Sequence, residues 1–274
     1  MGVETVPPAG TSSTPGACAR PVYFIGAGPG DPALVTRLGL EALEASASVL
    51  APAAFQRSFG PFLAGKDVAS PFRMDHDAVV RWVEERLERG PVAFLMPGDF
   101  STFCPFQSFV ARFRARARVI PGVGAHAAAA ALLGRTLDLP GVTHATVITS
   151  PRAFARDGGR VSLRDYARPG HMLVLYMNNL PLPELVAELR EGYGRGDVPI
   201  AILENVACPD QRVTVATLDT VVERIGERDP FGIDSEDPEP ALALVIVGEA
   251  LARDEDPSWW NRRYETVWKP RGME

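Results

Sequence analysis

The chain has 274 residues, a hydrophobic fraction of 46% and a formal net charge of −6. This length suits two modest domains or one large one, and the composition is ordinary for a globular enzyme. The negative charge argues against broad contact with nucleic acid, and no apolar run approaches the roughly 18 residues that are needed to cross a bilayer.

The cysteines and histidines carry no metal-binding pattern. Cys18, Cys104 and Cys208 lie too far apart in sequence for a CxxC cluster, and the four histidines lack the spacing of metal ligands. A reduced structural thiol fits Cys104 and Cys208 better than a nucleophilic one. We therefore expect no metal, a cytoplasmic location, and no membrane or nucleic-acid partner.

The composition along the chain predicts four segments. Residues 1–20 are rich in Pro, Gly, Ser and Thr and lack the basic start and apolar centre of a secretory signal, which predicts a disordered leader. Residues 21–150 predict an N-terminal α/β domain, and residues 171–274 predict a C-terminal α/β domain. The polar stretch between them, residues 151–170, predicts a linker with one helical turn.

The first predicted element is a short buried strand that ends in a glycine turn, within residues 22–32 (VYFIGAGPGDP). Such a turn at the carboxyl end of a strand exposes backbone N–H groups where α/β sheets bind their ligands. Thr36 and Asp75 are predicted to cap the next two helices, and an alanine-rich buried helix over residues 125–133 is predicted to end at Gly134. Further strands of this half are predicted over residues 48–51, 92–96, 118–120 and 145–149.

The second half repeats this alternation of strands and helices. Strands are predicted over residues 172–177, 200–206, 212–216 and 242–247, and helices over residues 183–190 and 218–225. Continuous apolar strands that alternate with helices predict sheets covered on both faces. The fold class predicted from these patterns is therefore α/β, with two α/β domains.

A strand, glycine turn and helix are also typical of a dinucleotide-binding unit. That motif needs glycine at its first, third and sixth positions and an acid roughly 20 residues further on. Here the sixth position is Asp31, and the second predicted strand ends in Ala51-Pro52 without a carboxylate. Both departures argue against a nicotinamide-dependent oxidoreductase.

Three successive motifs together carry a family resemblance: VYFIGAGPGDP, VAFLMPGDFSTF and RVIPGVGAHAAAAALLG. They strongly resemble the tetrapyrrole (corrin and porphyrin) methylases, and LVLYMN, ENVACPDQR, ATLDTVV and PALALVIVGE resemble that family's later blocks in the same order. The resemblance covers about residues 21–250. TLDLPGVTHATVITS is most similar to members that methylate C11 of precorrin-4 in cobalamin biosynthesis, whereas PALALVIVGE is more similar to uroporphyrinogen-III methyltransferases.

The resemblance implies a homodimer that transfers a methyl group from S-adenosylmethionine to a tetrapyrrole, with the cofactor in a cleft between the two α/β domains. Carried over position by position, it implies one set of cofactor-binding residues: Pro29, Gly98, Asp99, Ser101, Thr102, Phe103, Thr149, Ser150, Met177, Val206, Ala207, Pro240, Ala241 and Leu242.

Methyl transfer from a sulfonium needs alignment more than a strong base, because the donor is already activated. A proton must still leave the acceptor, and Asp99 and His126 are the candidate catalytic residues, with Glu204 as a further candidate. A precorrin carries many carboxylates, which arginines pair with well. Three arginines near the predicted linker are candidates for that role or are solvated linker charges: Arg152, Arg156 and Arg160.

One position departs from the family pattern. The second loop commonly reads Gly-Asp-Pro, whereas here Phe100 follows Gly98-Asp99. The change frees one φ angle and adds bulk, so it bears on the acceptor more than on the cofactor. The alternatives to precorrin-4 methylation are a relative that methylates a different small molecule or a peptide, and a catalytically silent relative that only binds the cofactor.

Overall fold

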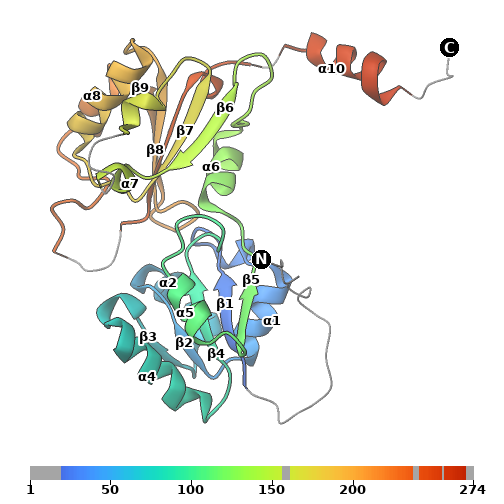
Figure 1. The fold of residues 1–274 in the computed structure, drawn as a ribbon, viewed down its shortest axis with the longest axis vertical. Coiled ribbons are helices and arrows are strands. Elements are labelled where there is room, and N and C mark those ends of the chain that lie inside the picture. The colour runs from blue at the N-terminus through green and yellow to red at the C-terminus, as the bar shows by residue number, and fades with distance from the viewer. Residues whose placement is uncertain (1–19, 156–160, 237–240, 255, 270–274) are drawn as a thin grey trace, which may run out of the picture. The chain divides into compact units, whose positions relative to one another are not determined.

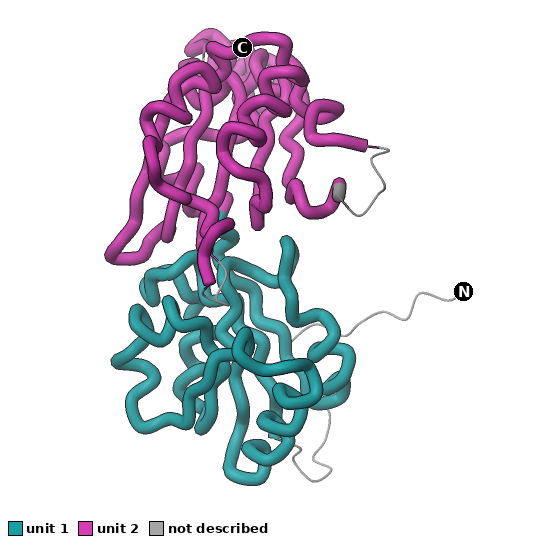
Figure 2. The backbone as a smooth tube through the Cα atoms, turned by 90° about the vertical axis from the view of Figure 1, so that its left-hand side faces the viewer, with its two compact units in different colours: residues 1–125 teal, residues 126–274 magenta. Residues whose placement is uncertain are grey.

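The computed structural model describes residues 20–155, 161–236, 241–254 and 256–269. The chain divides into two compact units, residues 1–125 and 126–274 (Figure 2). The predicted leader, residues 1–19, lies outside the described residues. The division falls earlier than the predicted domain end at residue 150, so residues 126–150 belong to the second unit.

The first unit contains a parallel sheet in the order β3-β2-β4-β1-β5 (Figure 1). Its strands are β1 (Val22–Gly26), β2 (Ser48–Leu50), β3 (Asp67–Ala69), β4 (Val92–Met96) and β5 (Ala117–Ile120). Its helices are η1 (Pro32–Leu34), α1 (Arg37–Ala45), α2 (Ala53–Ser58), α3 (Gly60–Leu63), η2 (Pro71–Arg73), α4 (His76–Leu87) and α5 (Gln107–Arg112).

Both predicted helix caps of this unit are confirmed. The Thr36 hydroxyl accepts the Gly39 N–H at 3.1 Å, and the Asp75 carboxylate accepts the Ala78 N–H at 2.7 Å. These bonds satisfy amide groups that a helix start leaves unpaired. They fix the beginnings of α1 and α4.

The two faces of the first sheet are covered by different helices. Phe24 and Phe94 stack with ring centroids 4.7 Å apart, and the buried residues of α4 and α5 pack in the same cluster. Ile25 points to the opposite face, because successive side chains of a strand alternate. There it meets α1, where a Cβ placed on Gly39 would lie 2.9 Å from Ile25 Cγ2.

The second unit contains a mixed sheet in the order β6-β7-β10-β8-β9. Only β6 and β7 are parallel among the described pairs of this sheet, and the other neighbours are antiparallel. Its strands are β6 (Ala145–Thr149), β7 (His171–Tyr176), β8 (Pro199–Glu204), β9 (Arg212–Thr217) and β10 (Ala243–Val247). Its helices are α6 (Ala125–Leu133), α7 (Pro151–Ala155), η3 (Leu163–Asp165), α8 (Leu182–Tyr193), α9 (Val221–Ile225), η4 (Glu249–Leu251), α10 (Ser258–Arg263) and the π-helical η5 (Tyr264–Trp268).

The two faces of this second sheet pack into two separate cores. On one face, which we call the α8 face, Leu173, Leu175 and Ile202 pack with buried residues of α8 and α9. On the other, which we call the α6 face, Met172 and Val174 pack with Ala129 of α6 and with Leu139. The alternation of side chains along each strand separates the two cores.

Two sequence-based expectations differ from the structure. The strand at residues 145–149, expected in the first half, is β6 and pairs with β7 of the second sheet. The helix at residues 125–133, expected to be buried, has one buried residue, Ala129, and Leu132 is 45% exposed. Pairing between strands is decided by contacts distant in sequence, and a run of alanines looks equally apolar on every side of a helix.

The loops that follow β1, β4 and β5 meet through backbone atoms at a site that we call the glycine junction: Gly26, Gly28, Gly98 and Gly122. Gly28 and Gly98 exchange two backbone hydrogen bonds, of 3.0 and 2.8 Å. A Cβ on Gly122 would lie 2.3 Å from the Gly26 carbonyl oxygen and 2.6 Å from that of Gly98. Gly28 and Gly98 both have a φ of +72°, which side chains disfavour. Glycine at the junction is therefore a steric requirement.

The substitution Gly122→Ala should destabilise the chain by roughly 1–3 kcal/mol or more, because the added methyl meets rigid backbone rather than a side chain that can turn away. Gly60→Ala is the matched control, since nothing lies within 4 Å of a Cβ there. The measurement is urea unfolding followed by circular dichroism. Equal transition midpoints for the two variants would show that the close approach at the junction is not a constraint.

Candidate active site

The loop after β4 is organised by the Asp99 carboxylate. The Ser101 hydroxyl donates to Asp99 Oδ2 at 2.7 Å, and the Thr102 hydroxyl donates to Asp99 Oδ1 at 3.0 Å. Both carboxylate oxygens therefore accept a bond from their own loop. The structure brings these three predicted residues together and gives Asp99 a role in shaping the loop, beside its predicted role in catalysis.

The same loop contains a strained residue and an anchoring aromatic cluster. Phe103 has a φ of +52°, in the left-handed region that non-glycine residues rarely adopt. Phe100, which replaces the family proline, is half-buried and packs against the core of the first unit together with Cys104. Phe106 is buried with its ring 5.5 Å from that of Phe94. The bulk of Phe100 is thus partly absorbed by the core beneath the loop.

Cys104 is a structural thiol. Its Sγ lies 3.6 Å from the sulfur of Met96, and burial raises the pKa of the thiol above its ordinary value, with a further rise from the nearby charge of Asp99. A raised pKa disfavours the thiolate, which is the nucleophilic form. This geometry supports the expectation that Cys104 is not a nucleophile.

In the second unit, the candidate catalytic residue His126 is held by a tyrosine. His126 lies in the first turn of α6, and its backbone N–H donates to the Tyr176 hydroxyl at 3.0 Å. The ring Nδ1 of His126 lies 2.9 Å from the same hydroxyl. The one hydroxyl of Tyr176 therefore contacts both the backbone and the ring of His126. Tyr176 was not identified from the sequence.

Residues at the ends of β6 and β7 meet beside this pair. The Ser150 hydroxyl donates to the Met177 carbonyl at 3.3 Å, and Ser150 is 1% exposed. Thr149 is the last residue of β6 and lies opposite Leu175 of β7. Met177 directly follows β7, has a φ of +44° and is 39% exposed. The structure therefore brings Thr149, Ser150 and Met177 together.

The turn after β8 lies at the same edge of the sheet. The Asn205 N–H donates to the Leu242 carbonyl at 2.8 Å, which joins this turn to the start of β10. The Ala207 N–H donates to the Gln211 side-chain oxygen at 2.7 Å. Val206, between Asn205 and Ala207, is 5% exposed. Asn205 and Ala207 have φ values of +51° and +60°. Asn205 and Gln211 are further residues of this edge that the sequence reading missed.

The non-glycine residues with positive φ form a small set in the described part of the chain: Phe103, Met177, Asn205 and Ala207. Three of them are predicted cofactor-binding residues, and the fourth lies two residues before Ala207. Left-handed backbone in such residues costs of order 1–3 kcal/mol each and is concentrated at functional sites. The strained backbone therefore lies in the same loops that contain the predicted cofactor-binding residues.

The remaining predicted residues are placed as follows. Pro29 is buried in the glycine turn, and Ala241 is exposed. Glu204 pairs with Arg228 at 2.7 Å, so its carboxylate is already engaged. Arg152 is exposed at the start of α7, and its backbone N–H donates to the Ser150 hydroxyl. Pro240, Arg156 and Arg160 lie outside the described residues.

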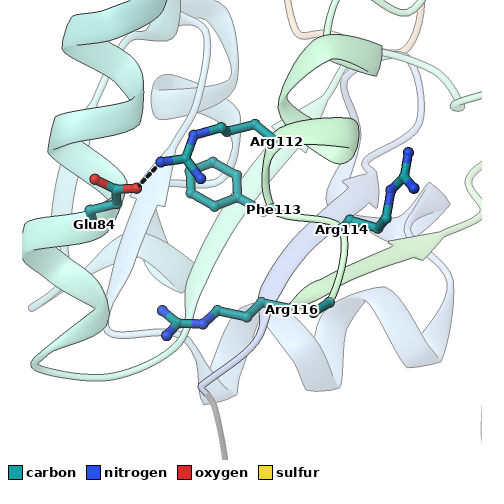
Figure 3. A pocket seen from close by; sticks show the side chains of 6 residues that line it. Glu84, Arg112, Phe113, Arg114 and Arg116 are labelled. Carbon is teal, nitrogen blue, oxygen red and sulfur yellow. Dashed lines mark hydrogen bonds and ion pairs between the residues drawn. The ribbon is translucent and has the colours of Figure 1, made fainter.

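A pocket of about 580 Å³ lies elsewhere in the first unit, between α4 and the turn before β5 (Figure 3). Glu84 and Arg112 form an ion pair of 2.5 Å at this pocket, and Arg116 also lines it. The pocket lies near the amino end of β5, whereas the glycine loops follow the carboxyl ends of parallel strands. None of the predicted site residues lines it.

The first turn also differs from a dinucleotide-binding turn. The Asp31 carboxylate accepts the Ala33 N–H at 2.8 Å and caps the short helix η1, so α1 begins only at Arg37. The glycine turn therefore does not lead directly into a long helix whose amino end could hold a pyrophosphate. The strand order also differs from the 3-2-1-4-5 order of that fold.

No group of His, Cys, Asp and Glu in the described segments has an arrangement that holds a metal ion. Within the same segments, no helix combines the length and the apolar character that crossing a membrane requires.

Residues 21–222 match the family described as Tetrapyrrole (Corrin/Porphyrin) Methylases. The chain belongs to this family. It is therefore a methyltransferase with the two-domain α/β fold that the motifs predicted. The family assignment and the fold class are both confirmed.

Named relatives and solved structures agree with this assignment. The precorrin-4 C(11)-methyltransferase of Rhodococcus erythropolis is 34% identical over 247 residues, which cover 86% of this chain and 94% of that protein. The enzyme of the same name from Pseudomonas aeruginosa is 30% identical over 257 residues, which cover 91% and 98%. The structure of a uroporphyrin-III C-methyltransferase from Thermus thermophilus, complexed with S-adenosylhomocysteine, has a TM-score of 0.64 and 26% identity and covers 84% of this chain and 98% of its own.

A structure of a cobalt precorrin-4 methyltransferase shares the fold of this tetrapyrrole methylase. Its TM-score is 0.69 at 21% identity, and the match covers 88% of this chain and all of the other.

The Cys104 thiol should react with iodoacetamide at least tenfold more slowly in the native protein than in urea at pH 7.5, because the raised pKa keeps it protonated. Mass spectrometry of the Cys104 peptide after timed quenching measures the rate, and the urea-unfolded chain is the reference. A native rate equal to the unfolded rate would return Cys104 to the list of nucleophiles.

Proposed function

We propose that this tetrapyrrole methylase transfers the methyl group of S-adenosylmethionine to C11 of precorrin-4. One observation carries the proposal: the left-handed backbone of Phe103, Met177 and Ala207 coincides with the cofactor positions that the family motifs imply. The two named relatives that are 30% and 34% identical over most of their length support precorrin-4 as the acceptor.

The residues present fit this cofactor. S-adenosylmethionine supplies, when bound, an electrophilic methyl group on a sulfonium centre. Adenine needs an apolar surface with a few backbone hydrogen bonds, and Met177 and Val206, which follow β7 and β8 at one edge of the second sheet, are apolar residues suited to it. The Asp99 loop, with Ser101 and Thr102 fixed on its carboxylate, offers polar groups for the remaining part of the molecule.

His126 is proposed to bind the acceptor rather than to remove its proton. Nδ1 of His126 contacts the Tyr176 hydroxyl, and in this proposal Nε2 carries the imidazole proton and donates it to a carboxylate of the tetrapyrrole. The exposed guanidinium of Arg152 is a second candidate donor for such carboxylates. Alignment of the acceptor and exclusion of water then account for most of the expected rate acceleration.

We also propose that the chain works as a homodimer in the cytoplasm. Exposed apolar residues on the second unit, among them Leu132, Val213 and Val215, are the kind of surface that a partner chain covers. Neither of the described cysteines, Cys104 and Cys208, forms a disulfide, which agrees with a reducing compartment.

A second candidate function keeps the donor and changes the acceptor. Phe100 in place of the family proline favours it, because that residue alters the loop that carries Asp99. A small-molecule natural product or a peptide is the alternative acceptor, and a silent cofactor-binding relative is a third outcome.

The first test is calorimetric titration of the purified chain with S-adenosylhomocysteine, with NADH as the control ligand, followed by incubation with precorrin-4 and S-adenosylmethionine. We expect binding near one site per chain, silence with NADH, and a methylated product by mass spectrometry. Binding without product on precorrin-4 would favour the second candidate. Silence with both ligands would reject the cofactor assignment.

Asp99→Ala should weaken S-adenosylhomocysteine binding or turnover at least tenfold, because the Ser101 and Thr102 hydroxyls lose the carboxylate that fixes their loop. Asp77→Ala is the matched control, since the Asp77 side chain is 86% exposed on α4. Calorimetry and initial rates are compared for both variants. Wild-type values for Asp99→Ala would reject the assignment of Asp99.

Phe100→Pro restores the family loop and should raise kcat/KM for precorrin-4 if Phe100 adapts the enzyme to a different acceptor. The affinity for S-adenosylhomocysteine should stay within about threefold, because Phe100 packs against the core of its own unit. Steady-state rates on precorrin-4 are the measurement. An unchanged or lower kcat/KM would show that Phe100 is not an adaptive change.

A further inference from the structure

Exposed apolar residues of the second sheet lie on one of its two faces. Ile148 of β6 lies opposite Val174, and Val213 and Val215 of β9 lie opposite Leu203 and Ala201 of β8. Neighbours directly opposite in a sheet share a face. Val174, Leu203 and Ala201 all belong to the α6-face core.

The α6 face is therefore uncovered at both flanks. Ile148 is 36% exposed at the β6 edge, and Val213 and Val215 are 38% and 42% exposed at the β9 edge. Leu132 of α6 is 45% exposed. Edge strands with exposed apolar side chains invite association unless another chain segment covers them.

The C-terminal helical segment, α10 with η5, carries a second uncovered apolar surface. Trp260, Tyr264, Val267 and Trp268 are between 44% and 61% exposed. They occur at positions i, i+4, i+7 and i+8, which places them on one side of a helix. We call these four residues the C-terminal stripe. The ring of Trp268 packs edge-on against Trp260, with centroids 4.7 Å apart, so the stripe is partly ordered by itself.

The opposite side of this segment is basic. Arg262 and Lys269 lie there, in ion pairs with Asp256 at 3.4 Å and with Glu265 at 3.2 Å. Arg263, three residues after Trp260, flanks the stripe. The whole chain, in contrast, has a net charge of −6. The segment therefore has the charge sign that an acidic protein body attracts.

We propose that the C-terminal stripe of one copy docks on the α6 face of a second copy. The proposal rests on the homodimer proposed above and adds the elements that would join it. A two-fold pair would use the same two surfaces twice, so that both are covered at once and no further copies are recruited. Tryptophan and tyrosine are the residues that contribute most to such contacts.

Carboxylates border the proposed docking face. The Thr146 hydroxyl of β6 donates to the Leu137 carbonyl at 2.6 Å, which holds Asp138 beside the strand that carries Ile148. Asp210 lies two residues before β9 at the other flank. Both carboxylates have the sign opposite to the net positive charge of residues 258–269.

A membrane surface is the competing occupant, because aromatic residues opposite cations also suit lipid headgroups. It accounts for the C-terminal stripe alone and leaves Ile148, Val213 and Val215 uncovered. A second copy accounts for both surfaces with one contact, and this favours the protein partner.

The decisive experiment is photo-crosslinking with p-benzoylphenylalanine in place of Tyr264 in the full chain. Equal amounts of ¹⁴N-labelled and ¹⁵N-labelled protein are mixed, unfolded in urea, refolded together so that mixed dimers can form, irradiated and digested. We expect crosslinked peptides of mixed isotope content that join residue 264 to β6, α6 or β9. Crosslinks within single isotope classes only would show docking in the same chain and overturn the proposal.

Analytical ultracentrifugation of two charge variants separates this proposal from the homodimer itself. Trp260→Glu should raise the dissociation constant of the dimer at least tenfold, whereas Thr266→Glu, which adds the same charge on the opposite side of the helix, should leave it within about twofold. A dimer unaffected by Trp260→Glu, without mixed crosslinks, would keep the homodimer and overturn the docking. A monomer at all concentrations would overturn both.

Flotation with phosphatidylglycerol vesicles tests the competing occupant. We expect the full chain to remain with the unbound fraction. Co-flotation that Trp260→Glu abolishes and Thr266→Glu preserves would assign the stripe to a lipid surface and overturn the proposal.

Discussion

The first unit depends on the close approach of three backbone turns. In a parallel sheet the loops after neighbouring strands emerge at one edge, and here the loops after β4, β1 and β5 meet there without intervening side chains. The two hydrogen bonds between Gly28 and Gly98 form an antiparallel bridge between the loops that follow the parallel strands β1 and β4. This contact fixes where β4 ends, and it therefore fixes where the Asp99 loop begins. The catalytic candidate of this unit, Asp99, therefore depends on the close packing of these glycines.

Most elements of the fold were predictable from local signals. Thr36 and Asp75 cap the helices that they were expected to cap, and the apolar runs of both halves are strands. The prediction that was wrong concerned which strands pair with each other, and pairing depends on contacts between residues far apart in sequence. The run at residues 145–149 has the pattern of a strand, but its partner β7 is chosen by packing on both sides, which no local pattern encodes. The short elements α2, α3 and β3 were missed because each is too short to show a period.

The candidate site was predictable where glycine, proline and acid mark the turns, as at Gly98-Asp99. It was less predictable where one side chain supports another. Tyr176 reads as an ordinary strand residue, yet its hydroxyl holds both the backbone and the ring of His126. Asn205 carries a weak signal in the sequence, because asparagine tolerates left-handed backbone better than most residues and this one follows an apolar strand. Gln211 has no such signal, since its bond to Ala207 spans a turn whose shape is known only from the structure.

The loop after β7 contains two locally unfavourable features, a left-handed residue and an unpaired buried acceptor, and the adjoining sheet must offset their cost. Met177 adopts left-handed backbone, and the next residue, Asn178, is 5% exposed. Its amide nitrogen donates to the Leu180 carbonyl at 2.6 Å, while its buried Oδ1 has no hydrogen-bond partner within the described segments. Turning the amide over would place two oxygens against each other, so the observed orientation is the better one.

A left-handed residue and an unpaired buried acceptor each cost about 1–3 kcal/mol. A chain of ordinary stability retains such a segment only where the adjoining strands hold it rigidly, and β7 does so through pairing on both sides. The rigid strand also maintains the hydrogen bond from the Ser150 hydroxyl to the Met177 carbonyl and the contact of the Tyr176 hydroxyl with His126. The pairing of β7 therefore both holds the strained backbone and positions the candidate site.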